Sequence, residues 1–242
     1  MKHYGIPGTQ QANDNASEEA AIFYVIKQKL SEIETSTLVR VISVTNDGGV
    51  APVGFVDVQP LVNQIDGKGN AMAHAPCRNI PYFRLQGGTN AIILDPQVGD
   101  IGMCVFCSRD ISRVKATKAQ ALPGSWRKFH MSDGIYFGGI LNGVPVQYIQ
   151  YNEGGITIHS PTKITISAPN IEMNASVAVD INTPQINLNG NLSQGKGSHG
   201  GDAAIGGTLT ADGDVVASGV SLDNHVHSGV QTGGGNTGKP VS

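Results

Sequence analysis

The chain has 242 residues, of which only 14% are charged, 5% are aromatic and 39% are hydrophobic. Its 32 glycines amount to nearly twice the usual share of about 7%. This composition excludes a thick core rich in Leu and Phe along the whole length, while the recurring Ile, Val and Thr favour a thin β-rich fold over disorder. The net charge of −3 provides no basic field that would hold nucleic acid or an anionic membrane.

The sequence has neither the apolar run of roughly 18 residues that a membrane span needs nor the pattern of a signal peptide, so synthesis in the cytoplasm is expected. Three cysteines, Cys77, Cys104 and Cys107, cannot all pair within one chain, which argues against a disulfide-stapled secreted fold. Cys104 and Cys107 form a C-x-x-C inside the apolar run 102–107. Because the third cysteine is distant, buried strand thiols are favoured over a zinc or redox site.

Residues 1–36 are expected to form a flexible arm followed by a short helix. Ser17 is a typical N-cap residue, and Glu18 and Glu19 would lie in the first turn, where negative charge is favourable. The helix is predicted to continue to Ile33. Its apolar stripe, with spacings of 4, 4 and 3, consists of Ile22, Ile26, Leu30 and Ile33. The stripe packs either on its own domain or against a sister chain, and both interpretations remain open.

Residues 37–150 change to an apolar period of two, which indicates β-strands. Leu38, Val39, Val41 and Val44 lie in the first predicted strand, a turn follows at 46–49, and a second strand is predicted over 54–62. Shorter apolar runs, separated by turn residues, lie at 91–94, 101–106 and 135–141. About four to six short strands without convincing helices between them predict a small closed β-barrel, and a β-sandwich remains the alternative.

Residues 151–220 have a different sequence pattern, in which apolar and polar residues alternate within short runs, several of which end at a proline or glycine. Apolar residues recur at every second position within each run, and the parity changes after Pro169 and again after Pro184. The runs lie at 155–161, 163–169, 170–174, 176–184 and 185–190. This pattern is typical of short strands with a small apolar inner face and an outer face of Asn, Thr and Ser, where the prolines stop each strand.

A single row of such narrow strands cannot bury its inner face, and the sequence offers no helix or aromatic sheet to cover it. Three intertwined chains would cover each inner face and would also pair each open sheet edge. We therefore expect a trimeric intertwined β-helix or β-prism with a pointed C-terminal tip. A single-chain β-solenoid of the left-handed hexapeptide kind is the alternative, although the segment 156–188 does not keep a six-residue period.

Residues 221–242 are expected to form a metal-binding apex. His225 and His227 are separated by one residue, so in an extended strand both imidazoles project from the same face. One chain supplies two nitrogens, whereas three chains around a threefold axis supply six, which is octahedral coordination and favours Fe²⁺, Co²⁺ or Ni²⁺ over Zn²⁺. Six ligands leave the ion no open position for a substrate, so its role would be structural.

An H-x-H pair is more commonly a pair of surface histidines or half of a mononuclear enzyme site. The metal interpretation is favoured because the pair follows a stretch rich in Gly and Ala, 190–219, that has little with which to fill a core. The remaining histidines are dispersed: His3, His74, His130, His159 and His199. Beyond the pair, residues 231–242 form either a tail or a segment that folds back over the apex.

Several short motifs follow one another in order from about Thr37 onward. They are Gly54-Phe-Val-Asp-Val-Gln-Pro-Leu61, Gly87-Gly88, Asp95-Pro-Gln-Val-Gly-Asp-Ile-Gly102, Val105-Phe-Cys-Ser-Arg-Asp-Ile111, His130-Met-Ser-Asp-Gly-Ile135 and His225-Val-His227. Together they resemble the baseplate assembly protein V family, which forms the central spike of contractile tails in Mu-like phages. The resemblance covers most of the chain from Thr37 onward.

The resemblance implies an OB-fold over 37–150, a trimeric β-helix spike over 151–220, and an apex over 221–242. In the apex, His225 and His227 of three chains would hold one iron ion per homotrimer, or another octahedral divalent metal. The resemblance also implies a structural virion protein rather than an enzyme. Its barrel would contact the baseplate hub and tail tube proteins, and its tip would pierce the host outer membrane on sheath contraction. The protein would assemble in the host cytoplasm and reside in the tail baseplate, with no nucleic acid or small-molecule substrate as partner.

Two other functions remain as alternatives. A hexapeptide-type β-solenoid acyltransferase would use His225 or His227 as general base, although the sequence lacks G-x-S-x-G and Walker motifs. A receptor-binding tail fibre would bind glycan through aromatic side chains, but no Phe, Trp or Tyr follows Tyr151. Asp212 and Asp214 are interpreted as turn residues in preference to a cation site.

Overall fold

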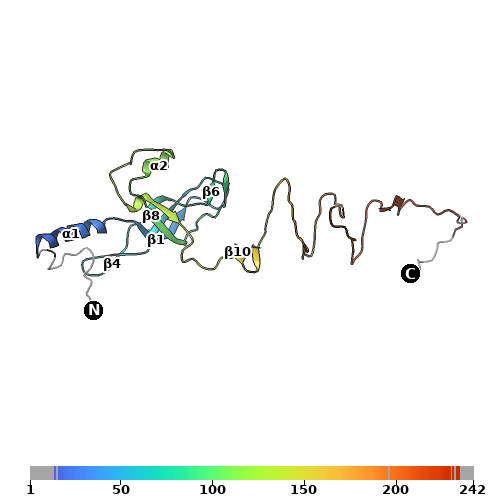
Figure 1. Cartoon of the computed structure of the whole chain (residues 1–242), viewed down its shortest axis with the longest axis horizontal. Coiled ribbons are helices and arrows are strands. Elements are labelled where there is room, and N and C mark those ends of the chain that lie inside the picture. The colour runs from blue at the N-terminus through green and yellow to red at the C-terminus, as the bar shows by residue number, and fades with distance from the viewer. Residues whose placement is uncertain (1–13, 15, 196, 230, 232, 235–242) are drawn as a thin grey trace. The chain divides into compact units, whose positions relative to one another are not determined.

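The computed structural model describes residues 14, 16–195, 197–229, 231 and 233–234. The chain divides into two compact units, Met1–Ser167 and Ala168–Ser242, and the two are described separately. The described residues of the first unit form two α-helices and a curled sheet (Figure 1). None of the helices in the described part of the chain has the length and apolar character needed to cross a membrane.

Helix α1, Glu18–Ser31, begins where the sequence predicts. The Ser17 side chain accepts a hydrogen bond from the Ala20 backbone N–H at 3.2 Å, which satisfies one of the free donors of the first turn. The helix ends two residues before the predicted Ile33, and an exposed ion pair joins Lys29 to Glu32 at 3.0 Å near that end. No residue of α1 is buried, and the predicted apolar stripe stays 41–62% exposed.

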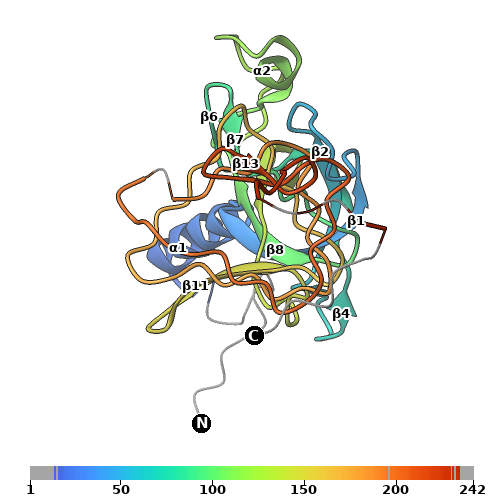
Figure 2. The ribbon, with the colours of Figure 1, turned by 90° about the vertical axis from the view of Figure 1, so that its right-hand side faces the viewer.

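Five strands of the first unit form one curled antiparallel sheet. In spatial order they are β5 (Cys77–Pro81), β2 (Phe55–Pro60), β1 (Ser36–Val44), β8 (Ile101–Phe106) and β9 (Gly134–Phe137). Figure 2 shows β1 and β8 in this sheet, with the neighbouring helix α2 outside it. The two edge strands approach each other through a parallel bridge between Tyr82 and Tyr136, where Phe83 N–H donates to the Tyr136 carbonyl at 2.8 Å. The result is a five-strand half-barrel, so the mostly β architecture with a short N-terminal helix is confirmed.

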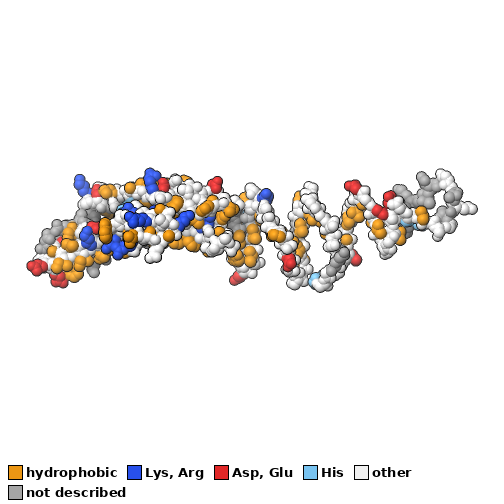
Figure 3. Space-filling model, turned by 90° about the horizontal axis from the view of Figure 1, so that it is seen from above, with side chains coloured by type: hydrophobic (Ala, Val, Ile, Leu, Met, Phe, Trp, Pro, Cys, Tyr) orange, Lys and Arg blue, Asp and Glu red, His pale blue; other side chains and the backbone are white. Residues whose placement is uncertain are grey.

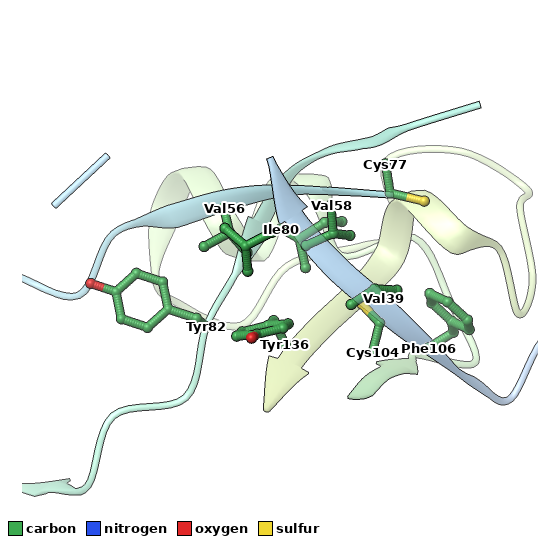
Figure 4. Packing of buried hydrophobic residues seen from close by; sticks show 10 residues of the cluster. Val39, Val56, Val58, Cys77, Ile80, Tyr82, Cys104, Phe106 and Tyr136 are labelled. Carbon is green, nitrogen blue, oxygen red and sulfur yellow. The ribbon is translucent and has the colours of Figure 1, made fainter. Parts of the chain in front are cut away.

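The core of the half-barrel comes from the alternating positions of these strands. On β2 and β8 every second residue is buried, as a strand with one face toward a core requires. The buried apolar side chains gather between the strands (Figure 4): Val39, Val41, Val56, Val58, Cys77, Ile80, Tyr82, Cys104, Phe106 and Tyr136. Cys104 of β8 is thus a buried strand thiol as predicted, and burial raises the pKa of Cys104 to about 12. Cys77 is also buried, in a strand, β5. Cys107 follows the last residue of β8 and is only half-buried, so the prediction of a buried strand thiol is wrong for Cys107. All three thiols are free.

Two elements of the half-barrel differ from the sequence prediction. Strand β5 was not predicted because its sequence, Cys-Arg-Asn-Ile-Pro, does not alternate; Asn79 has a left-handed φ of 56° and interrupts the pattern. A short helix, α2 (Ser112–Thr117), and a 3-10 turn, Met131–Asp133, lie between β8 and β9, where the sequence predicted no convincing helix. Polar contacts rather than an apolar stripe hold this connection: Arg127 pairs with Asp110 at 3.0 Å and with Asp133 at 3.2 Å.

The remaining strands form four small hairpins. They are β3 (Gln64–Ile65) with β4 (Ala71–Met72), β6 (Gln86–Gly87) with β7 (Asn90–Ala91), β10 (Tyr148–Asn152) with β11 (Gly155–His159), and β12 (Val216–Ala217) with β13 (Val220–Ser221). Three strands are shorter than the sequence predicts. β2 (Phe55–Pro60) was predicted over 54–62, β7 (Asn90–Ala91) over 91–94 and β9 (Gly134–Phe137) over 135–141. β8 has the predicted bounds.

Of the short strands predicted over 155–190, only β11 forms in the single chain. Among the described residues between His159 and Val216 there is no strand. The apolar side chains of this segment, from Ile164 to Leu188, are 52–95% exposed, and Figure 3 shows hydrophobic atoms at its surface. A strand requires a hydrogen-bonded neighbour, and in a single chain these runs have none.

Candidate metal-binding apex

A tight hairpin precedes the histidine pair. Strands β12 and β13 pair through Val216 with Ser221 and Ala217 with Val220. Ser218 and Gly219 join them with positive φ values of 50° and 85°, as a type I′ hairpin turn requires at both central residues. The Leu222 N–H donates to the Val215 carbonyl at 2.8 Å and extends the ladder by one bond.

The chain turns again directly after the hairpin. The Asn224 N–H donates to the Ser221 hydroxyl oxygen at 2.8 Å, and the Asp223 N–H donates to Asp214 Oδ1 at 3.1 Å. Hydrogen bonds, first that of the Ser221 side chain and then that of the Asp223 backbone, hold the pKa of Asp214 below its ordinary value. These bonds fix a turn over 222–224. Of the turn predicted at 212–214, Asp212 and Gly213 form a bend, and Asp214 lies just after it.

The turn determines how His225 is held. Its Nδ1 atom lies 2.9 Å from the Ser221 carbonyl oxygen and 3.1 Å from that of Leu222. A carbonyl oxygen only accepts, so Nδ1 must carry the proton in these contacts. The neutral ring then has its lone pair on Nε2, which is the state of a metal-ligating histidine whose other nitrogen donates to a backbone carbonyl.

The structure brings the two predicted ligands together. The ring centroids of His225 and His227 are 5.1 Å apart, with an interplanar angle of 79°. Both residues are exposed, and Val226 between them is 92% exposed. In the part of the chain that the structure describes, no group of three or more His, Cys, Asp or Glu residues is arranged to hold a metal. One chain therefore offers two imidazoles, and a six-ligand site requires further chains.

The dispersed histidines have other local environments. His130 Nδ1 accepts from the Ser132 N–H at 3.1 Å at the start of the 3-10 turn, and the His159 ring stacks on Tyr148 at 5.1 Å. His3 lies outside the described residues. Asp214 and Ser221, in contrast, make hydrogen bonds that hold the turn before His225, and these contacts were not predicted. The one signal in the sequence that could have indicated these contacts is Ser218-Gly219, which lies between Asp214 and Ser221 and favours a hairpin turn.

Comparison with protein families matches this same region. Residues 219–241 match the GpV Apex motif, and the match includes Gly219 of the hairpin turn, the 222–224 turn and both histidines. The chain thus carries, at its C-terminal end, the apex motif of a phage tail spike. This is consistent with the phage baseplate spike protein V family, as the sequence resemblance indicates. Comparison with curated protein sequences found no match.

Proposed function

We propose that the protein is the subunit of a homotrimeric central spike in a contractile phage tail baseplate, and that this spike pierces the host outer membrane when the sheath contracts. The observation that carries the proposal is the apex motif over 219–241, which contains the paired rings of His225 and His227. The motif points to a structural protein of the virion rather than an enzyme, and it favours the spike over the acyltransferase and fibre alternatives.

The half-barrel supports the assignment of an OB-fold domain to residues 37–150. The spatial order β5-β2-β1-β8-β9 places the first strand at the centre, and the Tyr82–Tyr136 bridge brings the two edges together. A five-stranded, partly open Greek-key barrel is the architecture of the OB-fold. In the proposed spike, this domain contacts the hub and tail tube proteins of the baseplate.

The hairpin β10–β11 supports the trimeric β-prism. Ile149 lies opposite Ile158 and Tyr151 opposite Ile156, so these four side chains share one face of the hairpin. All four are 59–75% exposed in the single chain. An isolated two-stranded hairpin is at best marginally stable in water. Packing of this face against two sister chains would bury it, and the apolar residues from Ile164 to Leu188 would continue the same buried axis.

The geometry of His225 supports a metal ion at the tip. Because Nδ1–H donates to the backbone, Nε2 is available as a ligand. We propose that His225 and His227 of three chains hold one iron ion, or another octahedral divalent metal, with six nitrogens. A bound ion of this kind contributes structural cross-linking of the three chain ends and provides no open position for a substrate.

The shape of purified particles tests the proposal. We expect electron micrographs of the isolated protein to show tapered needles whose class averages, viewed along the axis, have threefold symmetry. Bundles with other symmetry, or single globular particles, would contradict the spike. A decisive second test is labelling of contracted tails with an antibody against residues 221–242, which should bind at the baseplate end of the tail. Label along the sheath or on the head would contradict the location.

A further inference from the structure

We propose that Asp214 is a positioning residue for His225, acting through Ser221 and the turn over 222–224. This inference rests on the proposed metal site and identifies the side chain that prepares one of its ligands. Asp214 lies 11 residues before His225 in the sequence and does not belong to the H-x-H pair.

The first step is the contact of Asp214 with the turn. Its Oδ1 atom accepts from the Asp223 N–H at 3.1 Å, and its carboxylate also interacts with the Ser221 side chain. Asp214 precedes β12, whereas Asp223 follows β13. One carboxylate therefore joins the entry of the hairpin to the turn that leaves it.

The second step is the double role of Ser221. Its hydroxyl oxygen accepts from the Asn224 N–H at 2.8 Å, so its own proton is free to be donated to the Asp214 carboxylate. Among the described residues from Ala168 onward, Ser221 is the only one that is not exposed. It is thus the least exposed residue of this part of the chain, and its hydroxyl serves both as acceptor and as donor.

The third step leads from Ser221 to the metal ligand. The residue that presents its hydroxyl to Asp214 presents its carbonyl to His225 Nδ1 at 2.9 Å, and the neighbouring Leu222 carbonyl lies at 3.1 Å. Both carbonyls face the ring only while the 222–224 turn keeps its shape. By holding that turn, Asp214 fixes the ring orientation and keeps the proton on Nδ1, so that Nε2 remains a ligand.

The test compares Asp214→Ala with Asp212→Ala in trimers loaded with metal. Asp212 is an exposed carboxylate of the same loop. Loss of a group bonded directly to a metal ligand typically lowers metal affinity by about 10–100-fold. Because Asp214 acts through Ser221, we expect the lower end of this range, with release of metal to a chelator about 10-fold faster in Asp214→Ala. Asp212→Ala should release it at the wild-type rate. Asp214→Asn keeps one accepting oxygen for the Asp223 N–H and should give an intermediate rate.

A second readout reports the proton on the ring. In metal-free protein with nitrogen-15-labelled histidine, NMR should show His225 as the Nδ1–H tautomer in the wild type and in Asp212→Ala. In Asp214→Ala the population should shift toward the Nε2–H tautomer. A residue that merely stabilises the trimer would not produce this shift. Equal tautomer populations and equal release rates in the two alanine variants would overturn the inference.

A third variant covers the case in which Asp214→Ala fails to assemble. Ser221→Ala removes the hydroxyl but keeps the carbonyl that faces His225, and it should also speed metal release severalfold. Unchanged release from Ser221→Ala would then overturn the inference. A wild-type trimer without metal would overturn the proposed metal site and the inference together. Retention by the wild type with unchanged release from the variants overturns the inference alone.

Discussion

The imidazole rings of His225 and His227 lie with their centroids 5.1 Å apart at the C-terminal apex of the chain. The two rings come from residues separated only by Val226, and the first is held by backbone carbonyls on its Nδ1 side. One chain supplies only two of the six nitrogens of the proposed metal site. The proposed metal site therefore depends on the proposed trimer.

The first prediction concerns the metal. The double variant His225→Ala, His227→Ala should lose bound metal entirely, because it removes all six proposed nitrogens from the trimer. Structural zinc in small peptides contributes on the order of 10 kcal/mol to folding, so the tip should also become much more sensitive to protease. Elemental analysis and limited proteolysis measure both effects. His199→Ala, at an exposed histidine outside the apex, is the matched control, and equal metal content in both variants would exclude the assignment.

The second prediction concerns the apolar face of β10–β11. Ile158→Asp places a charge on the face proposed to be buried between chains, which costs at least several kcal/mol when the charge is unpaired. We expect this variant to remain monomeric in sedimentation. Thr157→Asp introduces the same charge on the opposite face of the hairpin and should leave the trimer intact. If both variants form trimers of equal stability, this face does not lie at the axis.

The third prediction concerns the half-barrel core. Ile80 is fully buried, and Ile80→Ala should lower the free energy of unfolding of the half-barrel by about 2–5 kcal/mol. Ile92, which is 61% exposed, provides the control, and Ile92→Ala should change the stability by less than about 0.5 kcal/mol. Urea unfolding followed by circular dichroism measures the difference. Equal effects of the two substitutions would show that Ile80 is not part of a packed core.

The fourth prediction concerns acid stability. Hydrogen bonds from Ser112 and Ser125, together with Arg127, hold the pKa of Asp110 well below its ordinary value. The Asp110 carboxylate therefore stabilises the fold at pH values above the pKa of an Asp carboxyl in the unfolded chain, about 3.9. This contribution is lost as the pH falls toward and through the lower pKa of Asp110 in the folded state. The melting temperature should drop between about pH 5 and pH 2. In Asp110→Asn the drop should be smaller, because this contribution is already missing at pH 5. The exposed Asp47→Asn variant should follow the wild-type pH profile, and a wild-type profile for Asp110→Asn would exclude this role.

Much of the half-barrel follows from local sequence patterns, and its exceptions have local causes. β1 and β2 were predictable from the apolar period of two, and β8 and β9 from short apolar runs between turn residues. β5 was not predicted because Asn79, in the middle of the strand, adopts a left-handed φ of 56°. Helix α2 was not predicted because none of its residues is buried; at its start, the Ser112 N–H donates to Asp110 Oδ1 at 2.8 Å.

For residues 155–190 and for the apex, less of the structure could be predicted from the sequence. The parity of the apolar residues over 155–190 is visible in the sequence, but strands require neighbours, and a single chain does not supply them. The closeness of His225 and His227 was predictable from their spacing in the sequence. The contacts of Asp214 and Ser221 were not, because they depend on a turn that brings residues seven and nine positions apart into hydrogen-bonding distance.

The most direct test of threefold assembly is native mass spectrometry with metal analysis of the same sample. We predict a species with three times the 25.2 kDa mass of the chain that carries one iron or other octahedral divalent ion. A folded single chain of 25.2 kDa with no bound metal would contradict the proposed spike.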